Sequence, residues 1–320
     1  MRSSLEYFTN HMLQISFFSS ATRLIMACCA ICIIASFSSC EKTVSINLSS
    51  TPPALVVEGS IESGFPPYVV LTNSIGFFDS VNLATVTSSF VHGATITVAD
   101  GSTVVNLKEI TIDSGSNKLS FYTVDNTDPM AANFKGQIDH YYKLTIVYNG
   151  KTYTSTTKIP NPKGVDSVWS GKITDSTNQR LLNARTLYYN YTDPDTPGDY
   201  VRYYTKKSHE FLYKPGRYVF NDQVVNGVTI TNQSLPPGTD GSTDTTKDHL
   251  SRYFFVGDTV NLKWSNIDKS TYTFWTTLAF ALNSVGNPFS SPINAQSNIS
   301  NGALGIWAGY GSKNYTIYIQ

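Results

Sequence analysis

The segment Asp193–Asp199, which reads DPDTPGD, brings three carboxylates close together in the sequence. Alternating acidic residues followed by a glycine are typical of calcium-binding loops, because Ca²⁺ takes oxygen ligands. Counted from Asp193, Gly198 stands at the sixth position, which an EF-hand loop reserves for glycine. Pro197 at the fifth position and Tyr204 at the twelfth, where a bidentate glutamate is needed, do not fit that loop. We therefore interpret the segment as a proline-stiffened turn and predict no metal site.

The other residues that could support catalysis show no recognisable spacing. No Gly-x-Ser-x-Gly elbow occurs, and the glycine-rich segment Gly309–Lys313 lacks the spacer of a phosphate-binding loop and precedes a strand-like segment. We predict no catalytic residue, no cofactor and no enzymatic activity. A surface glycan or peptide hydrolase stays the alternative, because a carboxylate pair formed only by the fold leaves no pattern in the sequence. The histidines of the long C-terminal part stand singly, without the spacing of zinc ligands: His92, His140, His209 and His249.

Cys40 is the one side chain for which the sequence predicts a covalent modification. The apolar, uncharged run Leu24–Phe37 is too short for a transmembrane helix and has the length of a signal-peptide core. Ser38-Ser39-Cys40 follows it and resembles a bacterial lipobox, in which the cysteine thiol is acylated before cleavage. We predict a lipoprotein signal peptide over residues 1–39, with Cys40 as the lipid-bearing first residue of the mature chain.

The leader departs from the lipobox pattern in two ways. Phe37 stands where lipoboxes usually carry leucine, and Glu6 lies in a region that is usually basic. Translation from Met12 instead of Met1 would remove that glutamate, and both start positions stay open. An ordinary cleaved signal peptide followed by an incidental thiol at Cys40 is the alternative.

Charge and composition exclude one class of function and favour one class of fold. With 23 Lys+Arg against 23 Asp+Glu, the chain carries no formal net charge. Nucleic-acid binding that relies on phosphate neutralisation needs a basic excess, so we predict no nucleic-acid partner. Aromatic residues make up 13% of the chain, and long stretches are rich in Thr, Ser, Asn, Val and Tyr. This mixture favours pleated strands and predicts an all-β protein.

After a polar tether over residues 40–53, the chain is expected to form an immunoglobulin-like β-sandwich over residues 54–160. About seven short strands separated by turn residues have the spacing of such a sandwich. Two hairpins are the clearest, because Asn149-Gly150 and Asp100-Gly101 each supply two residues suited to the positive φ angles of a tight turn. Pro160 and Pro162 then interrupt the strand pattern, and we place a domain boundary there.

Residues 161–320 are predicted to form a second β-rich domain with one helix near residues 268–285. Asp268 is the candidate N-cap of that helix. The segment Asn232–His249 contains a single apolar residue and is predicted to be a loop. The expected strands are Val165–Lys172, Ala184–Tyr191, Tyr200–Lys206, Phe211–Phe220 and Thr259–Trp264, and the expected packed face of the helix holds Tyr272, Trp275, Ala279 and Leu282.

Tyrosines cluster in the first strands of this second half. A tyrosine ring offers a flat apolar face and a hydroxyl, so exposed members of the cluster could stack on a sugar or a peptide. Neighbouring residues of a strand point to opposite faces, so we expect about half of the cluster to be core. Its members are Tyr188, Tyr189, Tyr191, Tyr200, Tyr203 and Tyr204.

Five segments of the chain, in this order, resemble the Gram-negative lipoproteins that carry a domain of unknown function numbered 4249. They match an opening pair of strands, an Ile-Pro-x-Pro connector, a loop before a Tyr-rich strand, an Asp-containing turn, and a C-terminal stretch with spaced glycines. Together they cover essentially the whole chain after Cys40. The segments are Leu55–Ser74, Thr157–Val168, Asp193–Thr205, Phe220–Gly227 and Ser291–Gly309.

The resemblance implies a location and a partner, and no reaction, because that family has no assigned activity. Its members resemble outer-membrane lipoproteins that are often encoded beside TonB-dependent receptors. It implies that acyl chains such as palmitate on Cys40 hold the protein at the outer membrane, on a face that the sequence leaves open. A non-enzymatic accessory or ligand-capture role for a TonB-dependent receptor follows as the expectation. A structural or adhesive surface protein is a further alternative, and the ligand is not identified.

Overall fold

The computed structural model describes residues 52–76, 80–101, 103–115, 117–173, 181–239, 253–284 and 294–320, and Ile25 alone in the leader. Met1–Ser50 and Thr51–Gln320 form separate units, and every strand of the described ranges belongs to the second unit. The predicted signal peptide (apart from Ile25), Cys40 and most of the predicted tether lie outside the described residues. No helix within the described ranges is both long enough and apolar enough to cross a bilayer.

Eleven strands form one large mixed sheet, in the order β11-β10-β14-β15-β1-β2-β5-β4-β3-β6-β7. Strands account for 51% of the structure and helices for 12%, so the prediction of an all-β protein is confirmed. The strands of this sheet are β1 (Leu55–Glu62), β2 (Tyr68–Asn73), β3 (Thr95–Asp100), β4 (Thr103–Ser114), β5 (Asn117–Val124), β6 (Tyr141–Tyr148), β7 (Lys151–Lys158), β10 (Tyr200–Lys207), β11 (Lys214–Asn221), β14 (Thr259–Ile267) and β15 (Leu304–Tyr318).

The first half of the chain has the strand order of an immunoglobulin-like sandwich. That fold pairs its strands as A-B-E-D in one sheet and C-F-G in the other. The order β1-β2-β5-β4 followed by β3-β6-β7 repeats this arrangement. The two sheets are continuous because β4 pairs with β3 through Thr103–Leu107 and with β5 through Leu107–Ser114. Alternating apolar residues of these strands, such as Val57, Ile96 and Leu144, fill the space between the sheets.

One of the two predicted hairpin turns forms as expected, and the other is displaced by one residue. Asn149 and Gly150 connect β6 to β7 with φ angles of 49° and 71°, which is the geometry that the dipeptide favours. In the second hairpin, Asp100 pairs with Thr103 and belongs to β3. Gly101, with a φ of 57°, is therefore the first residue of that turn, and the predicted Asp100-Gly101 turn is wrong by one position.

The second half of the chain adds a smaller sheet that faces the large one. β9 (Ala184–Thr192) is its centre and pairs with β8 (Ser167–Lys172), β12 (Thr229–Leu235) and β13 (Phe254–Phe255). Its buried residues Leu187 and Tyr189 pack in one cluster with Tyr203 and Trp264 of the large sheet. β12 occupies the start of the segment predicted as a loop, so that prediction is wrong for Asn232–Leu235. Residues 240–249 of the same segment lie outside the described ranges.

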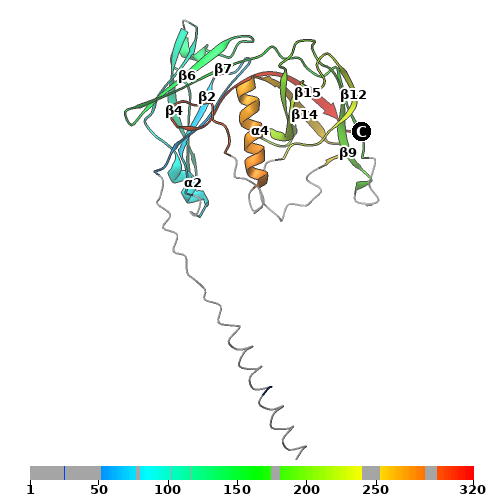
Figure 1. Ribbon diagram of the computed structural model, residues 1–320, viewed down its shortest axis with the longest axis horizontal. Helices are drawn as coiled ribbons and strands as arrows, with labels where there is room; N and C mark the ends of the chain where they lie inside the picture. The colour runs from blue at the N-terminus through cyan, green and yellow to red at the C-terminus, as the bar shows by residue number, and fades with distance from the viewer. Residues whose placement is uncertain are drawn as a thin grey trace, which may run out of the picture. The chain divides into compact units, whose positions relative to one another are not determined.

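The predicted helix forms as α4 (Lys269–Ser284), and the other helices of the described chain, α2 (Leu83–Ser89) and α3 (Pro129–Ala132), are short. Asp268 caps α4 as predicted, since its Oδ1 accepts a hydrogen bond of 2.8 Å from the Thr271 amide. In Figure 1, α4 stands in front of the sheet, between the strands of the two halves. Phe274 is the buried apolar residue of α4. Leu282 is exposed, so its predicted place on the packed face of the helix is wrong.

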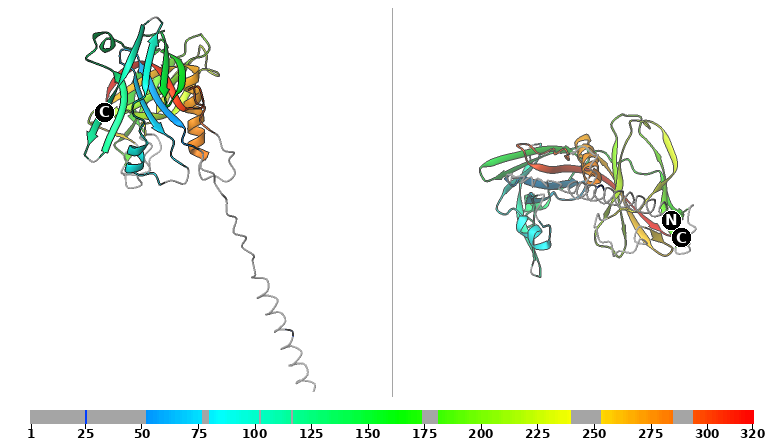
Figure 2. Two further views of the ribbon diagram at one scale, coloured as in Figure 1. Left: turned by 90° about the vertical axis from the view of Figure 1, so that its left-hand side faces the viewer. Right: turned by 60° about the horizontal axis from the view of Figure 1, so that its bottom comes forward.

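The two halves share one sheet and part of one hydrophobic cluster, because Ile299, Ala303 and Trp307 pack in the cluster of the first half. β15 pairs in parallel with β1, the first strand, and in antiparallel with β14. Figure 2 shows this strand, in red, running from one half into the other. Thr51–Gln320 is accordingly one compact unit. Residues on both sides of the boundary predicted between residues 160 and 161 therefore belong to one sheet and, in part, to one cluster of buried side chains.

The Pro-rich connector after β7 crosses directly over β15, and two glycines make that close approach possible. A Cβ atom added to Gly309 would lie 2.3 Å from the carbonyl oxygen of Lys158, and one added to Gly311 would lie 2.0 Å from that of Pro160. The buried hydroxyl of Thr157 links the two segments to the start of α4. It accepts a hydrogen bond of 2.8 Å from the Gly309 amide and donates one of 2.7 Å to Asp268. The contacts join β7, β15 and the cap of α4.

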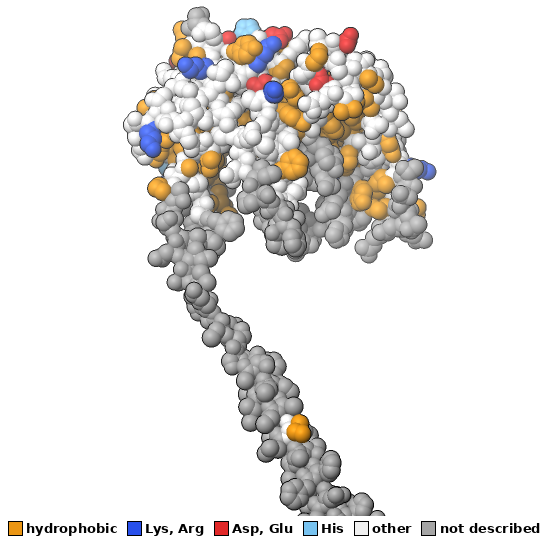
Figure 3. Space-filling model, in the orientation of Figure 1, with side chains coloured by type: hydrophobic (Ala, Val, Ile, Leu, Met, Phe, Trp, Pro, Cys, Tyr) orange, Lys and Arg blue, Asp and Glu red, His pale blue; other side chains and the backbone are white. Residues whose placement is uncertain are grey.

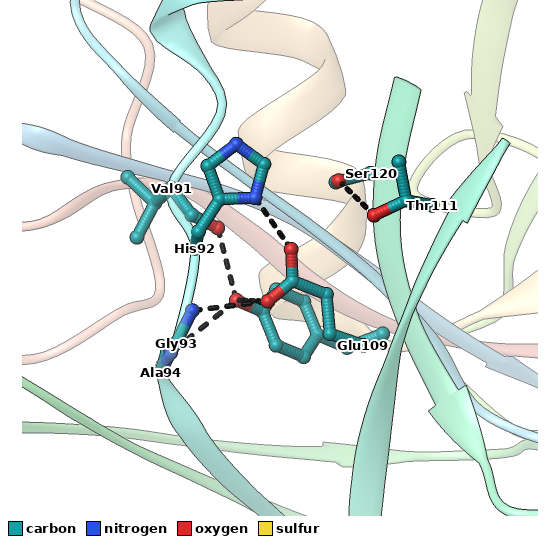
Figure 4. A network of polar contacts seen from close by, with 8 residues as sticks. Val91, His92, Gly93, Ala94, Glu109, Thr111 and Ser120 are labelled. Atoms are coloured by element: carbon teal, nitrogen blue, oxygen red, sulfur yellow. Dashed lines mark hydrogen bonds and ion pairs between the residues drawn. The ribbon is translucent and has the colours of Figure 1, made fainter. Parts of the chain in front are cut away.

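Glu109 of β4 holds the segment before β3 by a network of hydrogen bonds (Figure 4). Its carboxylate contacts His92 Nδ1 and accepts a hydrogen bond of 3.0 Å from the Gly93 amide. Burial opposes its ionisation, but these bonds and one from the Tyr122 hydroxyl outweigh that effect and lower the pKa of Glu109. Burial raises the pKa of Tyr122 to about 12, so this hydroxyl keeps its proton and also contacts the Val91 carbonyl at 2.9 Å.

We predict that Gly309→Ala lowers the free energy of unfolding by about 2–3 kcal/mol, since the added methyl group must displace backbone atoms of the connector. Urea denaturation followed by tryptophan fluorescence measures the change. Leu304→Ala on the same strand is the control, because Leu304 is exposed and its replacement should change stability by less than about 0.5 kcal/mol. Equal effects of the two substitutions would contradict the crossing.

We predict that Glu109→Gln lowers the free energy of unfolding by about 1–2 kcal/mol at pH 7, because charge-assisted hydrogen bonds are lost. The folded-state pKa of Glu109 is depressed, so its stabilisation is complete above the unfolded-state pKa of about 4.3 and disappears as the pH falls through the folded value. Denaturation of both proteins between pH 7 and pH 3 should therefore show converging stabilities. Glu58→Gln, at an exposed position of β1, serves as the control, and a constant difference across this range would refute the network.

Candidate functional site

A groove of about 440 Å³ lies between α4 and β11, and its residues come from three elements. β10 contributes Arg202, β11 contributes Pro215 and Val219, and α4 contributes Trp275 and Phe280. Strand alternation explains the position of Arg202, because Val201 and Tyr203 face the core between the sheets. The arginine consequently faces the opposite side of the sheet, which α4 covers.

Arg202 is a buried cation whose guanidinium makes no hydrogen bond to the described residues. Only 7% of the residue is exposed, and its Nε and Nη1 atoms are buried without any acceptor in the described structure. No described carboxylate forms an ion pair with it. The carboxylate of Glu62, which acts on the neighbouring Tyr204, is already paired with Lys263 at 3.0 Å. The guanidinium charge is therefore not neutralised by the part of the chain that the structure describes.

Two aromatic rings contact this guanidinium. Its carbon lies 3.4 Å from the ring centre of Trp275 and 5.3 Å from that of Tyr204. The Trp275 ring is held in place, since its Nε1 donates a hydrogen bond of 3.1 Å to the hydroxyl of Tyr310. Burial raises the pKa of Tyr204 and of Tyr310, against the opposing influence of Arg202. Both hydroxyls stay neutral and supply no negative charge.

The cation–π contacts do not fully compensate the cost of burying the charge of Arg202. A desolvated cation–π contact is worth about 2 kcal/mol, whereas an uncompensated buried charge costs about 3–5 kcal/mol. An anionic group on a ligand would offset the remaining cost by accepting hydrogen bonds from the Nε and Nη1 atoms of Arg202. The groove thus has the chemistry of a site for an anion with an apolar body.

The wall that α4 contributes to the groove is apolar and open to solvent. Phe280 and Leu282 are 60% and 65% exposed, although both side chains are large and hydrophobic. Figure 3 shows hydrophobic side chains gathered in the region of α4 and the strands beside it. An exposed apolar patch next to a convergent polar group is a common property of binding sites.

The predicted division of the tyrosine cluster agrees with the structure. Tyr189, Tyr191 and Tyr203 are buried, and each contacts another aromatic ring of the core. The remaining three are partly buried, and Tyr204 is the member that contacts the candidate site. The other two partly buried tyrosines stack on aromatic rings: Tyr188 packs against Trp169, and Tyr200 packs against Tyr272.

The other described residues considered from the sequence as candidate site residues do not line the groove. His92 and His140 contact carboxylates of their own half, Glu109 and Asp100. The Gly309–Lys313 segment lies within β15 and forms no phosphate-binding loop. Asp193 and Asp199 do come together, and they meet a third carboxylate, that of Asp222.

Sequence reasoning missed Arg202 as a site residue. The available signal was one arginine inside a strand of apolar and aromatic residues, which is an unusual place for an unpaired charge. Trp275 was expected on the packed face of the helix, and it packs there against Arg202. Their meeting could not be foreseen, because it depends on where α4 crosses β10.

A search of curated proteins finds no match to this chain. The family model described as a domain of unknown function (DUF4249) matches residues 41–316, which include the groove, the connector and nearly all of β15. The chain therefore belongs to the DUF4249 family.

Proposed function

We propose that this protein is a non-enzymatic, lipid-anchored capture protein of the outer membrane, which binds an amphipathic anion in the Arg202 groove and acts with a TonB-dependent receptor. The observation that supports ligand capture is the buried, unpaired guanidinium of Arg202 beneath an open apolar wall. The proposed lipid anchor rests on Cys40 and the apolar run before it, and the proposed partner rests on the family resemblance.

The proposed ligand has a carboxylate, sulfonate or phosphate head and an apolar chain or ring. Its head would lie against Arg202, whose guanidinium packs on the Trp275 ring at 3.4 Å. Its apolar part would lie along Phe280 and Leu282, whose exposure it would reduce. A neutral ligand of the same shape would leave the charge of Arg202 uncompensated and bind more weakly.

Binding of 8-anilinonaphthalene-1-sulfonate, an aromatic anion, tests the capture site. We predict saturable fluorescence enhancement by the full-length protein, and displacement by dodecanoate at least about tenfold more effective than displacement by dodecanol. Arg202→Met should weaken the binding of the probe at least about tenfold. The same variant should match or exceed the wild-type stability to urea, because an apolar side chain replaces an unpaired buried charge.

Two further variants keep this test decisive. Lys206→Met removes a positive charge from the same strand outside the groove and should bind the probe as the wild type does. Leu282→Ser changes an exposed wall residue, so it should weaken binding without unfolding the protein. Unchanged probe affinity in both Arg202→Met and Leu282→Ser would overturn the proposed site.

The anchor and the partner are tested in cells. We predict that a fatty-acid probe labels the wild-type protein and that Cys40→Ser abolishes both the label and recovery in the outer-membrane fraction. Affinity purification of the tagged wild type from gently solubilised membranes should recover a TonB-dependent receptor. Labelling of Cys40→Ser would contradict the anchor, and a preparation that hydrolyses a glycan or peptide and recovers no receptor would contradict the accessory role.

A further inference from the structure

Three aspartates from three strand ends meet at one edge of the second half. Asp193 directly follows β9, Asp199 directly precedes β10, and Asp222 directly follows β11. One carboxylate oxygen of each lies within 4.8 Å of the others. Asp193 and Asp222 are each only 5% exposed, so these charges do not project into solvent.

The bonds that hold these carboxylates leave most of their oxygens unused. Asp222 Oδ2 accepts hydrogen bonds from the amides of Gly198 and Asp199, at 2.6 and 3.0 Å. Asp193 Oδ2 accepts one of 3.3 Å from the Gly227 amide. Asp199 Oδ2 is buried and has no partner in the described structure. No lysine or arginine of the described ranges forms an ion pair with the cluster.

Repulsion and burial both act on the cluster. Burial raises the pKa of Asp193 and of Asp199, and the charge of Asp222 raises both further. The structure thus holds like charges together in a partly buried place, which is unfavourable unless a positive ion or a proton joins them.

A buried hydroxyl gives an independent indication that a ligand binds here. Tyr191 is 5% exposed, and its hydroxyl makes no hydrogen bond of normal geometry within the described ranges. Burial raises the pKa of this hydroxyl, and the charges of Asp193 and Asp199 and a weak interaction with the Asp193 carboxylate raise it further. Tyr191, Asp193 and Asp199 line one cavity of about 170 Å³ together with Trp264. A buried hydroxyl seldom lacks a partner, so this oxygen is available to an ion or to its water ligand.

The donor set is made only of oxygen atoms. Ca²⁺ takes six to eight oxygen ligands at about 2.3–2.6 Å, so two ligands on opposite sides of one ion are about 4.6–5.2 Å apart. The three carboxylate oxygens lie within 4.8 Å of one another, so none of their separations exceeds the span that one ion bridges. Zinc prefers nitrogen and sulfur ligands, and the cluster offers neither.

We propose that Asp193, Asp199 and Asp222 form a Ca²⁺ site, in which the Tyr191 hydroxyl faces the ion or one of its waters. The ion would join the end of β9, in the small sheet, to the ends of β10 and β11, in the large sheet. It would act as a structural link between the two sheets, and it does not depend on the anion groove.

Terbium luminescence tests the site directly, because Tb³⁺ occupies Ca²⁺ sites and is sensitised by nearby tyrosine and tryptophan rings. We expect saturable Tb³⁺ emission from the full-length protein, reversed by Ca²⁺ with a dissociation constant of about 0.1–1 mM. Asp222→Asn should reduce the affinity for Tb³⁺ and for Ca²⁺ at least about tenfold. Asp199→Asn provides the same test if Asp222→Asn fails to fold.

The matched control is Asp195→Asn, which removes one charge from the same loop but lies outside the cluster. Asp195 is exposed and contacts the Asn226 side chain at 3.5 Å. Its replacement should change the affinity less than about twofold. Tyr191→Phe should keep the three carboxylates and weaken binding by a smaller factor than Asp222→Asn.

Thermal denaturation with Ca²⁺ gives a second readout. At a Ca²⁺ concentration tenfold above the dissociation constant, the Tm of the wild type should rise by about 3–5 °C relative to the EDTA-treated protein. Asp222→Asn should lose this rise, and Asp195→Asn should keep it. Absence of saturable binding in the wild type, equal losses in these two variants, or selective stabilisation by Mg²⁺ alone would overturn the Ca²⁺ site.

Discussion

The fold depends on the crossing of the Pro-rich connector over β15. β15 can pair with β1 and with β14 in one sheet because Gly309 and Gly311 leave room for the connector backbone directly above the strand. Thr157 then links the amide of Gly309 to Asp268, the residue that caps α4. The position of the helix, and with it one wall of the anion groove, follows from this crossing.

The two proposed sites both arise where the fold retains a charge that its own described residues do not neutralise. Arg202 is buried under α4 with no described acidic side chain paired to it, and the three carboxylates at the strand ends have no described basic side chain paired to them. Unpaired buried charges are a poor source of stability, since apolar replacements of them are often neutral or stabilising. We therefore regard the groove and the cluster as binding sites and the aromatic residues around them as the parts that fix their geometry.

The segments that resemble the family in sequence lie together in the structure. The opening strand pairs with the C-terminal glycine-rich strand, and the Ile-Pro-x-Pro connector crosses that strand. The Asp-containing turn supplies Asp222, and the loop before the Tyr-rich strand supplies Asp193 and Asp199. Segments far apart in the chain are thus parts of the same two features, the β15 crossing and the acidic cluster.

The sequence by itself determined the local elements. Period-two alternation, the Asn149-Gly150 turn and the Asp268 cap depend on neighbouring residues, and all three agree with the structure. The all-β class and the expectation of a sandwich in the first half followed from the same local signals. Only the tertiary structure decided which strands share a sheet, because the pairing of β1 with β15 joins opposite ends of the chain. The sites were decided at the same level, since the Arg202–Trp275 stack and the meeting of Asp222 with Asp193 and Asp199 are contacts between distant segments that no local pattern encodes.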